Sequence, residues 1–374
     1  MKIRTFVTAL VVAGSLSACS GDGQSEPKAE VLAPSIALIE AETPNETTLA
    51  AGDTSFSLLS PTGRKLIELR DGFCFYSLAN DLVATKEKCA PLAQSKMREG
   101  SDYSWNPSET RVLSGKNLGL SRGVDTDISY IDVARGEEIV LTEDAVAGRI
   151  ENGTTANIDM SPVWTSDDRI AFLRFANRAT SIMSMSVSDD TPKKLLDVPR
   201  TTYLLVSSPD GKRLAFMERR DAGDHHVWVV DAAGGISTEL KSLAGRDWPT
   251  LQFSADAGRL LACYNGEYST FTCRVIDVSA DTSSDIAGGL QLFGATWSPA
   301  GELVAYVVAP QQQATSGIYV DDIASGRSKL IVSNPEGAFF DAAIAGGQIT
   351  WATDLLAVRK GRHLTLIRLK SAPG

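Results

Sequence analysis

Short strands of alternating apolar and polar residues, separated by turn signals, run along most of this chain. The clearest example is Ser207–Phe216, where the turn sequence Ser-Pro-Asp-Gly leads into the apolar run Leu-Ala-Phe. Proline presets the backbone angle φ that a turn needs at its second position, and glycine accepts a positive φ without a clash. The alternation after the turn is typical of a half-buried strand. The pattern therefore predicts a strand that follows directly from a tight turn.

This unit recurs along the chain at a nearly constant spacing. The second residue of each copy stands at position 60, 106, 165, 208, 254, 298 and about 345, so the gaps are 46, 59, 43, 46, 44 and about 47 residues. A second marker, an apolar strand that ends at an aspartate 23 residues after the motif, keeps the same phase at Asp231, Asp277 and Asp321. Each period has room for four short strands, and propeller blades have this length.

A single four-stranded sheet cannot bury both of its faces, whereas sheets stacked radially bury them and leave only short edges exposed. The repeat therefore predicts an all-β protein, a β-propeller over residues 53–374 with four-stranded antiparallel blades. The mean period favours seven blades, and six blades remain as the alternative. We expect the Trp or Phe that begins several of the turn motifs to pack between blades.

The repeated motif resembles the WD40-like repeat of TolB-type β-propellers. Ser207–Phe216 and Trp297–Tyr306 match the pattern best, and the resemblance covers roughly residues 54–370. The resemblance implies the same repeat type and the same propeller fold.

The first nineteen residues predict a lipoprotein signal peptide. Lys2 and Arg4 precede the apolar run 6–14, which is short for a membrane span. The sequence Leu16-Ser-Ala-Cys19 then matches the lipobox of bacterial lipoproteins. We therefore expect a lipid on Cys19 that anchors the protein in the cell envelope, where it faces the periplasm. By analogy, a serine after the cysteine favours the outer membrane over the inner one.

Residues 20–52 are rich in Gly, Ser, Glu, Pro and Thr and predict a flexible tether. The apolar island Ser35–Glu40 within this stretch has strand character. It is either a further piece of tether or a closing strand that completes the last blade and joins the two ends of the ring.

Four cysteines besides Cys19 predict two disulfides, because export permits their oxidation. The sequence alone allows three pairings. Cys74 and Cys89, like Cys263 and Cys273, flank a short connection between strands, where facing hairpin positions come close enough to bridge. We favour these two local pairings, and free buried thiols are the alternative. Neither pair forms the Cys-x-x-Cys motif of a redox or zinc site.

The charge and the motifs give little support for a nucleic-acid-binding protein or an enzyme. The net charge of −10 argues against a basic groove for nucleic acid. The sequence lacks the Gly-x-Ser-x-Gly, His-Glu-x-x-His and Walker A motifs. We expect neither a cofactor nor a metal, except that calcium could be held by acidic residues such as those of Asp125–Asp127.

Loops that join second to third strands, and one blade to the next, share one rim of a propeller and vary most in this sequence. Binding usually resides on such loops. The candidate binding residues on this rim are His225, His226, Tyr268, Phe271, Gln311 and Gln312. We expect the two histidines to lie in a solvated loop. The sequence thus predicts a lipid-anchored, non-catalytic propeller that binds another envelope protein or a cell-wall component. The alternative is a metal-dependent hydrolase or lactonase with its site at the central channel.

Overall fold

The structure is a computed structural model of the chain. It describes residues 39–41, 45–48, 56–69, 72–91, 101–116, 127–142, 157–189, 191–221, 224–246, 248, 250–265, 271–308, 315–333, 349–360 and 363–371. All of these residues belong to one compact unit, Pro34–Gly374. Within it, the described strands form six antiparallel sheets.

Four of these sheets have four strands each, and we number them as blades in chain order. The first blade contains β3 (Phe56–Leu59), β4 (Lys65–Leu69), β5 (Gly72–Leu78) and β6 (Ala84–Pro91). The second blade contains β7 (Ser101–Trp105), β8 (Arg111–Lys116), β9 (Ser129–Asp132) and β10 (Glu137–Val140). The third blade contains β11 (Ile158–Trp164), β12 (Arg169–Ala176), β13 (Ala179–Ser186) and β14 (Lys193–Val198). The fourth blade contains β15 (Thr202–Ser207), β16 (Arg213–Arg219), β17 (His225–Asp231) and β18 (Thr238–Leu240).

The two remaining sheets are larger. The double sheet contains β19 (Thr250–Phe253), β20 (Arg259–Asn265), β21 (Phe271–Asp277), β22 (Thr282–Asp285), β23 (Leu292–Trp297), β24 (Leu303–Val308), β25 (Gly317–Asp322) and β26 (Arg327–Ser333). The closing blade contains β27 (Ile349–Ala352), β28 (Leu355–Lys360), β29 (His363–Ser371), β1 (Ile39–Ala41) and β2 (Asn45–Thr48). Two short 3-10 turns, Lys241–Leu243 and Ile286–Gly289, follow β18 and β22.

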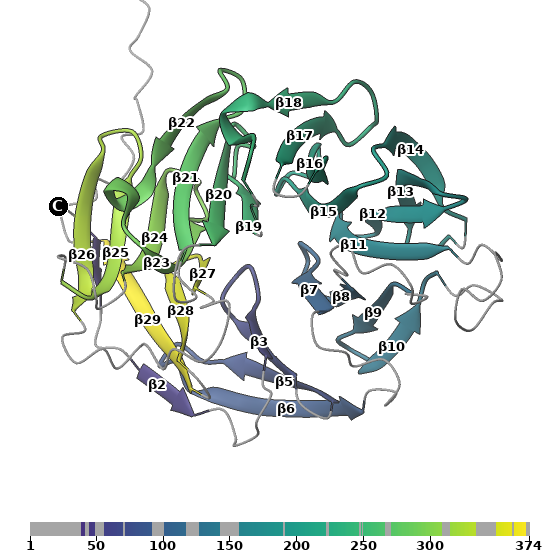
Figure 1. The fold of residues 1–374 in the computed structure, drawn as a ribbon. Coiled ribbons are helices and arrows are strands. Elements are labelled where there is room, and N and C mark those ends of the chain that lie inside the picture. Colours follow the sequence, from purple (N-terminus) through teal and green to yellow (C-terminus); the bar gives the residue numbers. More distant parts are fainter. Residues whose placement is uncertain are drawn as a thin grey trace, which may run out of the picture. The chain divides into compact units, whose positions relative to one another are not determined.

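The predicted all-β propeller with four strands in a blade is confirmed, and the first strand of each blade lies innermost (Figure 1). The hydrogen bonding does not give the predicted seven blades, nor the alternative of six. Five sheets have the size of a single blade, and one has eight strands. The reason is one backbone pair, Phe271 with Leu292, which makes β21 and β23 neighbours and so joins two sequence periods into one sheet.

Tryptophans of the turn motif pack between neighbouring blades, as the sequence predicts. Trp105, Trp164 and Trp297 are 8%, 7% and 3% exposed. Each indole Nε1 donates to a backbone oxygen of the preceding period: Leu58 at 3.3 Å, Ser104 at 3.0 Å and Gln252 at 3.0 Å, respectively. A buried indole N–H needs such a partner, so the motif contributes one directed bond across each of these three junctions.

Glycines of the turn motif explain why its backbone can approach the neighbouring blade so closely. Gly211 has φ +69°, and a Cβ added there would lie 1.8 Å from the backbone oxygen of Thr165 in the third blade. Gly301 has φ +78°, and a Cβ there would lie 2.6 Å from the backbone nitrogen of Ala255. Only glycine combines this conformation with this proximity.

The ring closes through residues that are far apart in the sequence. β1 and β2 pair antiparallel with β29, with Ile39 opposite Ser371 and Asn45 opposite Leu366. The closing-strand interpretation is therefore confirmed for Ile39 and Glu40, whereas residues 35–38 lie outside the described residues. The correction to the predicted boundary is that the closing blade already includes residues 39–41 and 45–48, which the sequence assigned to the tether.

Both local cysteine pairs form disulfides. Cys74 bonds to Cys89 across β5 and β6, and Cys263 bonds to Cys273 across β20 and β21, each with a Cα–Cα distance of 4.0 Å. These are the two pairings favoured from the sequence. Cys89 is exposed, whereas Cys263 and Cys273 are 2% and 0% exposed.

Candidate functional site

The two predicted histidines do not lie in a solvated loop. His225 and His226 are the first residues of β17 and are 8% and 7% exposed. The expectation fails because the hairpin continues further than the sequence indicated: Arg219 pairs with His225, and Glu218 pairs with His226. Neighbouring residues of a strand point to opposite faces, so the two imidazoles enter different environments.

Each imidazole has its own polar partners. Nδ1 of His225 lies 2.8 Å from the hydroxyl of Tyr203. In His226, Nδ1 lies 2.6 Å from Oε1 of Glu239 and Nε2 lies 3.0 Å from Oδ1 of Asp224. Burial lowers the pKa of His226, but the bonds to Asp224 and Glu239 favour its charged form and together raise the pKa above its usual value. His226 is therefore the buried member of an ion-pair network whose carboxylate side chains, Asp224 and Glu239, are 46% and 22% exposed.

Of the other four predicted rim residues, the structure describes Phe271 alone. Phe271 begins β21, is half-buried and pairs with Leu292. Tyr268, Gln311 and Gln312 lie outside the described residues, as do Cys19, the predicted lipidation site, and Asp125, the first of the two aspartates proposed for calcium.

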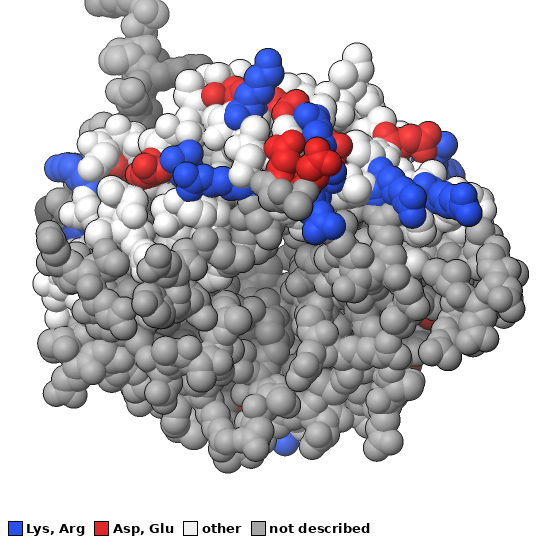
Figure 2. All heavy atoms as spheres, viewed as in Figure 1, with Lys and Arg blue, Asp and Glu red and all other residues white. Residues whose placement is uncertain are grey.

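Charge alone does not mark a binding site on the visible face of the described residues. Figure 2 shows that Lys and Arg are interspersed with Asp and Glu there. A recess with defined chemistry is a better indication of binding.

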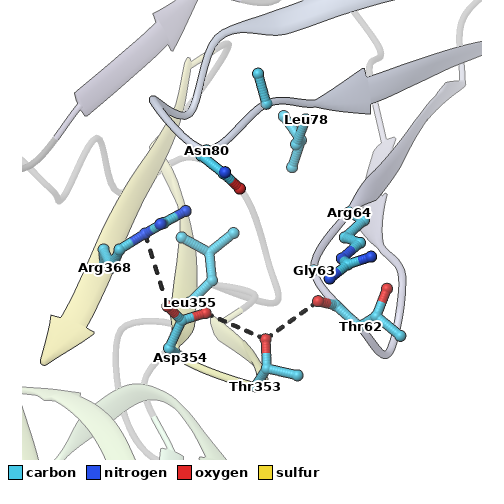
Figure 3. Close-up of a pocket in the computed structure, with 10 residues that line it drawn as sticks. Thr62, Gly63, Arg64, Leu78, Asn80, Thr353, Asp354, Leu355 and Arg368 are labelled. Atoms are coloured by element: carbon cyan, nitrogen blue, oxygen red, sulfur yellow. Dashed lines mark hydrogen bonds and ion pairs between the residues drawn. The ribbon is translucent and has the colours of Figure 1, made fainter. Parts of the chain in front are cut away.

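A pocket of about 550 Å³ lies at the junction of the first blade and the closing blade (Figure 3). We call it the junction pocket. Three turns and one strand line it: the β3–β4 turn, the β5–β6 turn, the β27–β28 turn and β29. Its lining residues are Thr62, Gly63, Arg64, Leu78, Ala79, Asn80, Thr353, Asp354, Leu355 and Arg368. These turns join first to second and third to fourth strands, so the pocket lies on the rim opposite to the one predicted from loop variability.

The junction is held together by both apolar and polar contacts. One hydrophobic cluster joins Leu59 and Leu66 of the first blade with Leu355 and Leu366 of the closing blade. At the pocket, the Thr353 hydroxyl donates to the backbone oxygen of Thr62 at 3.1 Å. The β3–β4 turn and the β27–β28 turn, which are separated by nearly the whole chain, are therefore bonded to each other in the wall of the pocket.

One of the nine described non-glycine residues with a positive φ lies at the same turn. Thr353 has φ +48°, a value that a β-branched residue rarely adopts. Its hydroxyl also lies 3.3 Å from Oδ1 of Asp354. Such strain persists where surrounding contacts fix the conformation, and it is commonest at functional sites.

The pocket contains more positive than negative side chains. Nε of Arg368 lies 3.7 Å from Oδ2 of Asp354, which is an ion pair but too long for a hydrogen bond. Arg64 is exposed and makes no side-chain hydrogen bond or ion pair with any residue that the structure describes. Asn80 adds an exposed amide. This set of donors can bind an acceptor group.

The sequence contained only a weak indication of this pocket. Ser60–Gly63 is a recognisable but poor copy of the turn motif, and the copy near position 345 is the weakest. Gly63 has φ +72°, which favours glycine, while a Cβ added there would make an ordinary contact at 3.4 Å with the backbone oxygen of Ala352. The predicted ring makes the first and last blades neighbours, but nothing in the sequence indicates a pocket between their turns.

The residues that the structure describes contain no group of three or more His, Cys, Asp or Glu side chains that could hold a metal ion. Among the same residues, no helix has the length and apolar character that a membrane crossing requires.

Comparisons with known proteins identify the fold. No protein-family model matches the sequence, and no curated protein matches it either. The structure is similar to an oligogalacturonate lyase in complex with manganese, with a TM-score of 0.56, 11% identity and coverage of 88% of this chain and 97% of that one. It is also similar to the oligogalacturonate lyase of Vibrio parahaemolyticus, with a TM-score of 0.57, 10% identity and coverage of 88% and 98%.

TolB proteins are also among the structural neighbours. TolB from Acinetobacter baumannii has a TM-score of 0.42 and 13% identity, over 90% of this chain and 81% of that one. The lyases, at 10–11% identity, support the propeller fold alone.

Proposed function

We propose that this protein is a lipid-anchored, non-catalytic binding module of the cell envelope, and that its junction pocket receives a segment of a partner protein. The lipobox-like sequence that ends at Cys19 supports the anchor and the envelope location. We propose that the anchor holds the propeller on the periplasmic side of the outer membrane.

The observation that carries the binding proposal is the junction pocket itself. Its turns are held together by the bond between Thr353 and Thr62 and by the hydrophobic cluster that joins the two blades. Loops on a rigid scaffold can bind a ligand with little loss of conformational entropy. The pocket also presents Arg64 and Asn80 to solvent, and these two side chains can contact a partner directly.

The chemistry of the lining residues favours binding over catalysis. No lining residue is a His, Cys or Ser, and the hydroxyl of Thr353, a type of group that acts as a nucleophile in some enzymes, donates to the backbone oxygen of Thr62. The carboxylate of Asp354 is engaged by Thr353 and Arg368. The role left for the remaining polar groups is recognition.

A photo-crosslinking amino acid at position 80 tests this function in intact envelopes. We expect the Asn80 probe to capture a defined protein, which then binds the purified propeller with a measurable Kd. A probe at Ile236, which is 94% exposed on the fourth blade, is the matched control. Equal capture at both positions, or no capture at Asn80, contradicts the proposal.

The second candidate is a metal-dependent enzyme on the same fold, such as a hydrolase or lactonase. The observation in its favour is the similar fold of an oligogalacturonate lyase that was solved with manganese. Thermal unfolding with manganese, calcium or EDTA separates the two candidates. A metal that binds the folded state raises Tm, and we expect no change.

A further inference from the structure

We propose that the junction pocket binds a carboxylate of an acidic peptide segment through Arg64 and Arg368, an inference that rests on the proposed function. It adds the chemical class of the ligand and the residues that select it.

The charge balance of the pocket favours a single negative charge. Arg64 and Arg368 supply two positive charges and Asp354 supplies one negative charge, so the lining residues sum to +1. This local excess lies in a chain whose net charge is −10. A carboxylate neutralises the pocket, whereas a phosphate near its usual charge of −2 leaves it negative.

Arg368 has hydrogen-bonding capacity that its neighbours do not use. Its Nε is buried and has no hydrogen-bond partner, because the nearest carboxylate oxygen of Asp354 is 3.7 Å away. A buried donor left unsatisfied is costly. The Arg368 side chain as a whole is 25% exposed, and guanidinium groups bind carboxylates particularly well because two parallel N–H bonds match two oxygens.

Arg64 is placed to complete the site from the other wall. Figure 3 shows Arg64 and Arg368 on opposite sides of the pocket, with Asn80 near its upper edge. Since Arg64 is exposed and has no side-chain partner among the described residues, it can turn toward a bound group without breaking an existing contact. The amide of Asn80 can donate to a peptide carbonyl or accept from a peptide N–H.

The lining residues favour a peptide over an acidic sugar. None of the ten is aromatic, so the pocket has no ring on which a sugar could stack. Its hydroxyl, amide and guanidinium groups instead match the donors and acceptors of a peptide backbone and an acidic side chain.

The test measures binding of a fluorescein-labelled peptide, Gly-Ser-Glu-Glu-Ser-Gly amide, by fluorescence anisotropy with the full-length protein. We expect its affinity to exceed that of the Gln-Gln analogue and to fall as salt is added. Arg64→Gln should weaken binding about tenfold, which corresponds to about 1.4 kcal/mol. Asp354→Asn should strengthen it several-fold, because the competing negative charge is gone while the side chain keeps nearly the same shape.

Arg135→Gln is the matched control, because Arg135 is exposed on the β9–β10 turn and does not line the pocket. Equal affinities for all variants overturn the assignment, and so does a pocket-dependent trigalacturonate complex without peptide binding. Because Arg64→Gln and Asp354→Asn should shift affinity in opposite directions, general loss of folding cannot reproduce the result. Capture of a partner at Asn80 without acidic-peptide binding overturns this inference alone. Peptide binding without capture contradicts the proposed function instead.

Discussion

The close packing of neighbouring blades predicts that one small substitution, Gly211→Ala, lowers the free energy of unfolding by an unusually large amount. A single added methyl group at this position would lie 1.8 Å from the backbone oxygen of Thr165. No rotamer change can relieve this clash, because both atoms belong to or are directly bonded to the main chain. The third and fourth blades must therefore separate locally.

The loss of unfolding free energy caused by Gly211→Ala has two parts, and a second glycine, Gly326, allows us to separate them. Gly326 has φ +64°, close to the +69° of Gly211, but an added Cβ there would meet nothing within 4 Å. Gly326→Ala therefore measures the left-handed backbone alone, about 1 kcal/mol. Gly211→Ala adds the cost of overpacking, about 1–3 kcal/mol or more. We expect a total destabilisation of about 3 kcal/mol.

Urea unfolding followed by tryptophan fluorescence measures both variants against the wild type. Gly301→Ala is an independent second case, because an added Cβ would lie 2.6 Å from the backbone nitrogen of Ala255. The expected order of stability is wild type, Gly326→Ala, then the two clashing variants. Equal losses for Gly211→Ala and Gly326→Ala would refute the idea that the turn glycines permit contact between blades.

Three further predictions concern charge, disulfides and the anchor. The pKa of His226 is raised in the folded state, so its ion pairs stabilise the fold fully below about pH 6.5 and lose this effect as pH rises through the folded pKa. The difference in unfolding free energy between wild type and His226→Asn should therefore shrink from pH 6 to pH 9. A difference independent of pH would contradict this. Replacing both Cys263 and Cys273 by Ala should lower the free energy of unfolding by about 2–4 kcal/mol. Because both cysteines are buried, mild reductant should open the more exposed Cys74–Cys89 disulfide first, as thiol alkylation and mass spectrometry would reveal. The reverse order would contradict the burial argument. Cys19→Ser should abolish incorporation of labelled palmitate and release the protein from membranes, and continued membrane association would argue against lipid anchoring.

The sequence by itself determined the local parts of this protein, because each is encoded within a few neighbouring residues. The turn at Ser207–Phe216 and its copies set four-stranded units, and a hairpin brought Cys263 opposite Cys273. The tryptophans of the motif could be assigned to the space between blades before their carbonyl partners were known. Periodicity and turn chemistry are local properties, so no knowledge of distant residues was needed.

Only the tertiary structure decided how these units meet. The pairing of Ile39 with Ser371 and the bond between Thr353 and Thr62 both join segments separated by most of the chain. The partner of His226 on β18 likewise depended on where two strands began. Such contacts arise from the accumulated twist and register of all the intervening sheets. The junction pocket exists because the twist and register of all the intervening sheets bring the first and closing blades together. No single stretch of sequence encodes that arrangement.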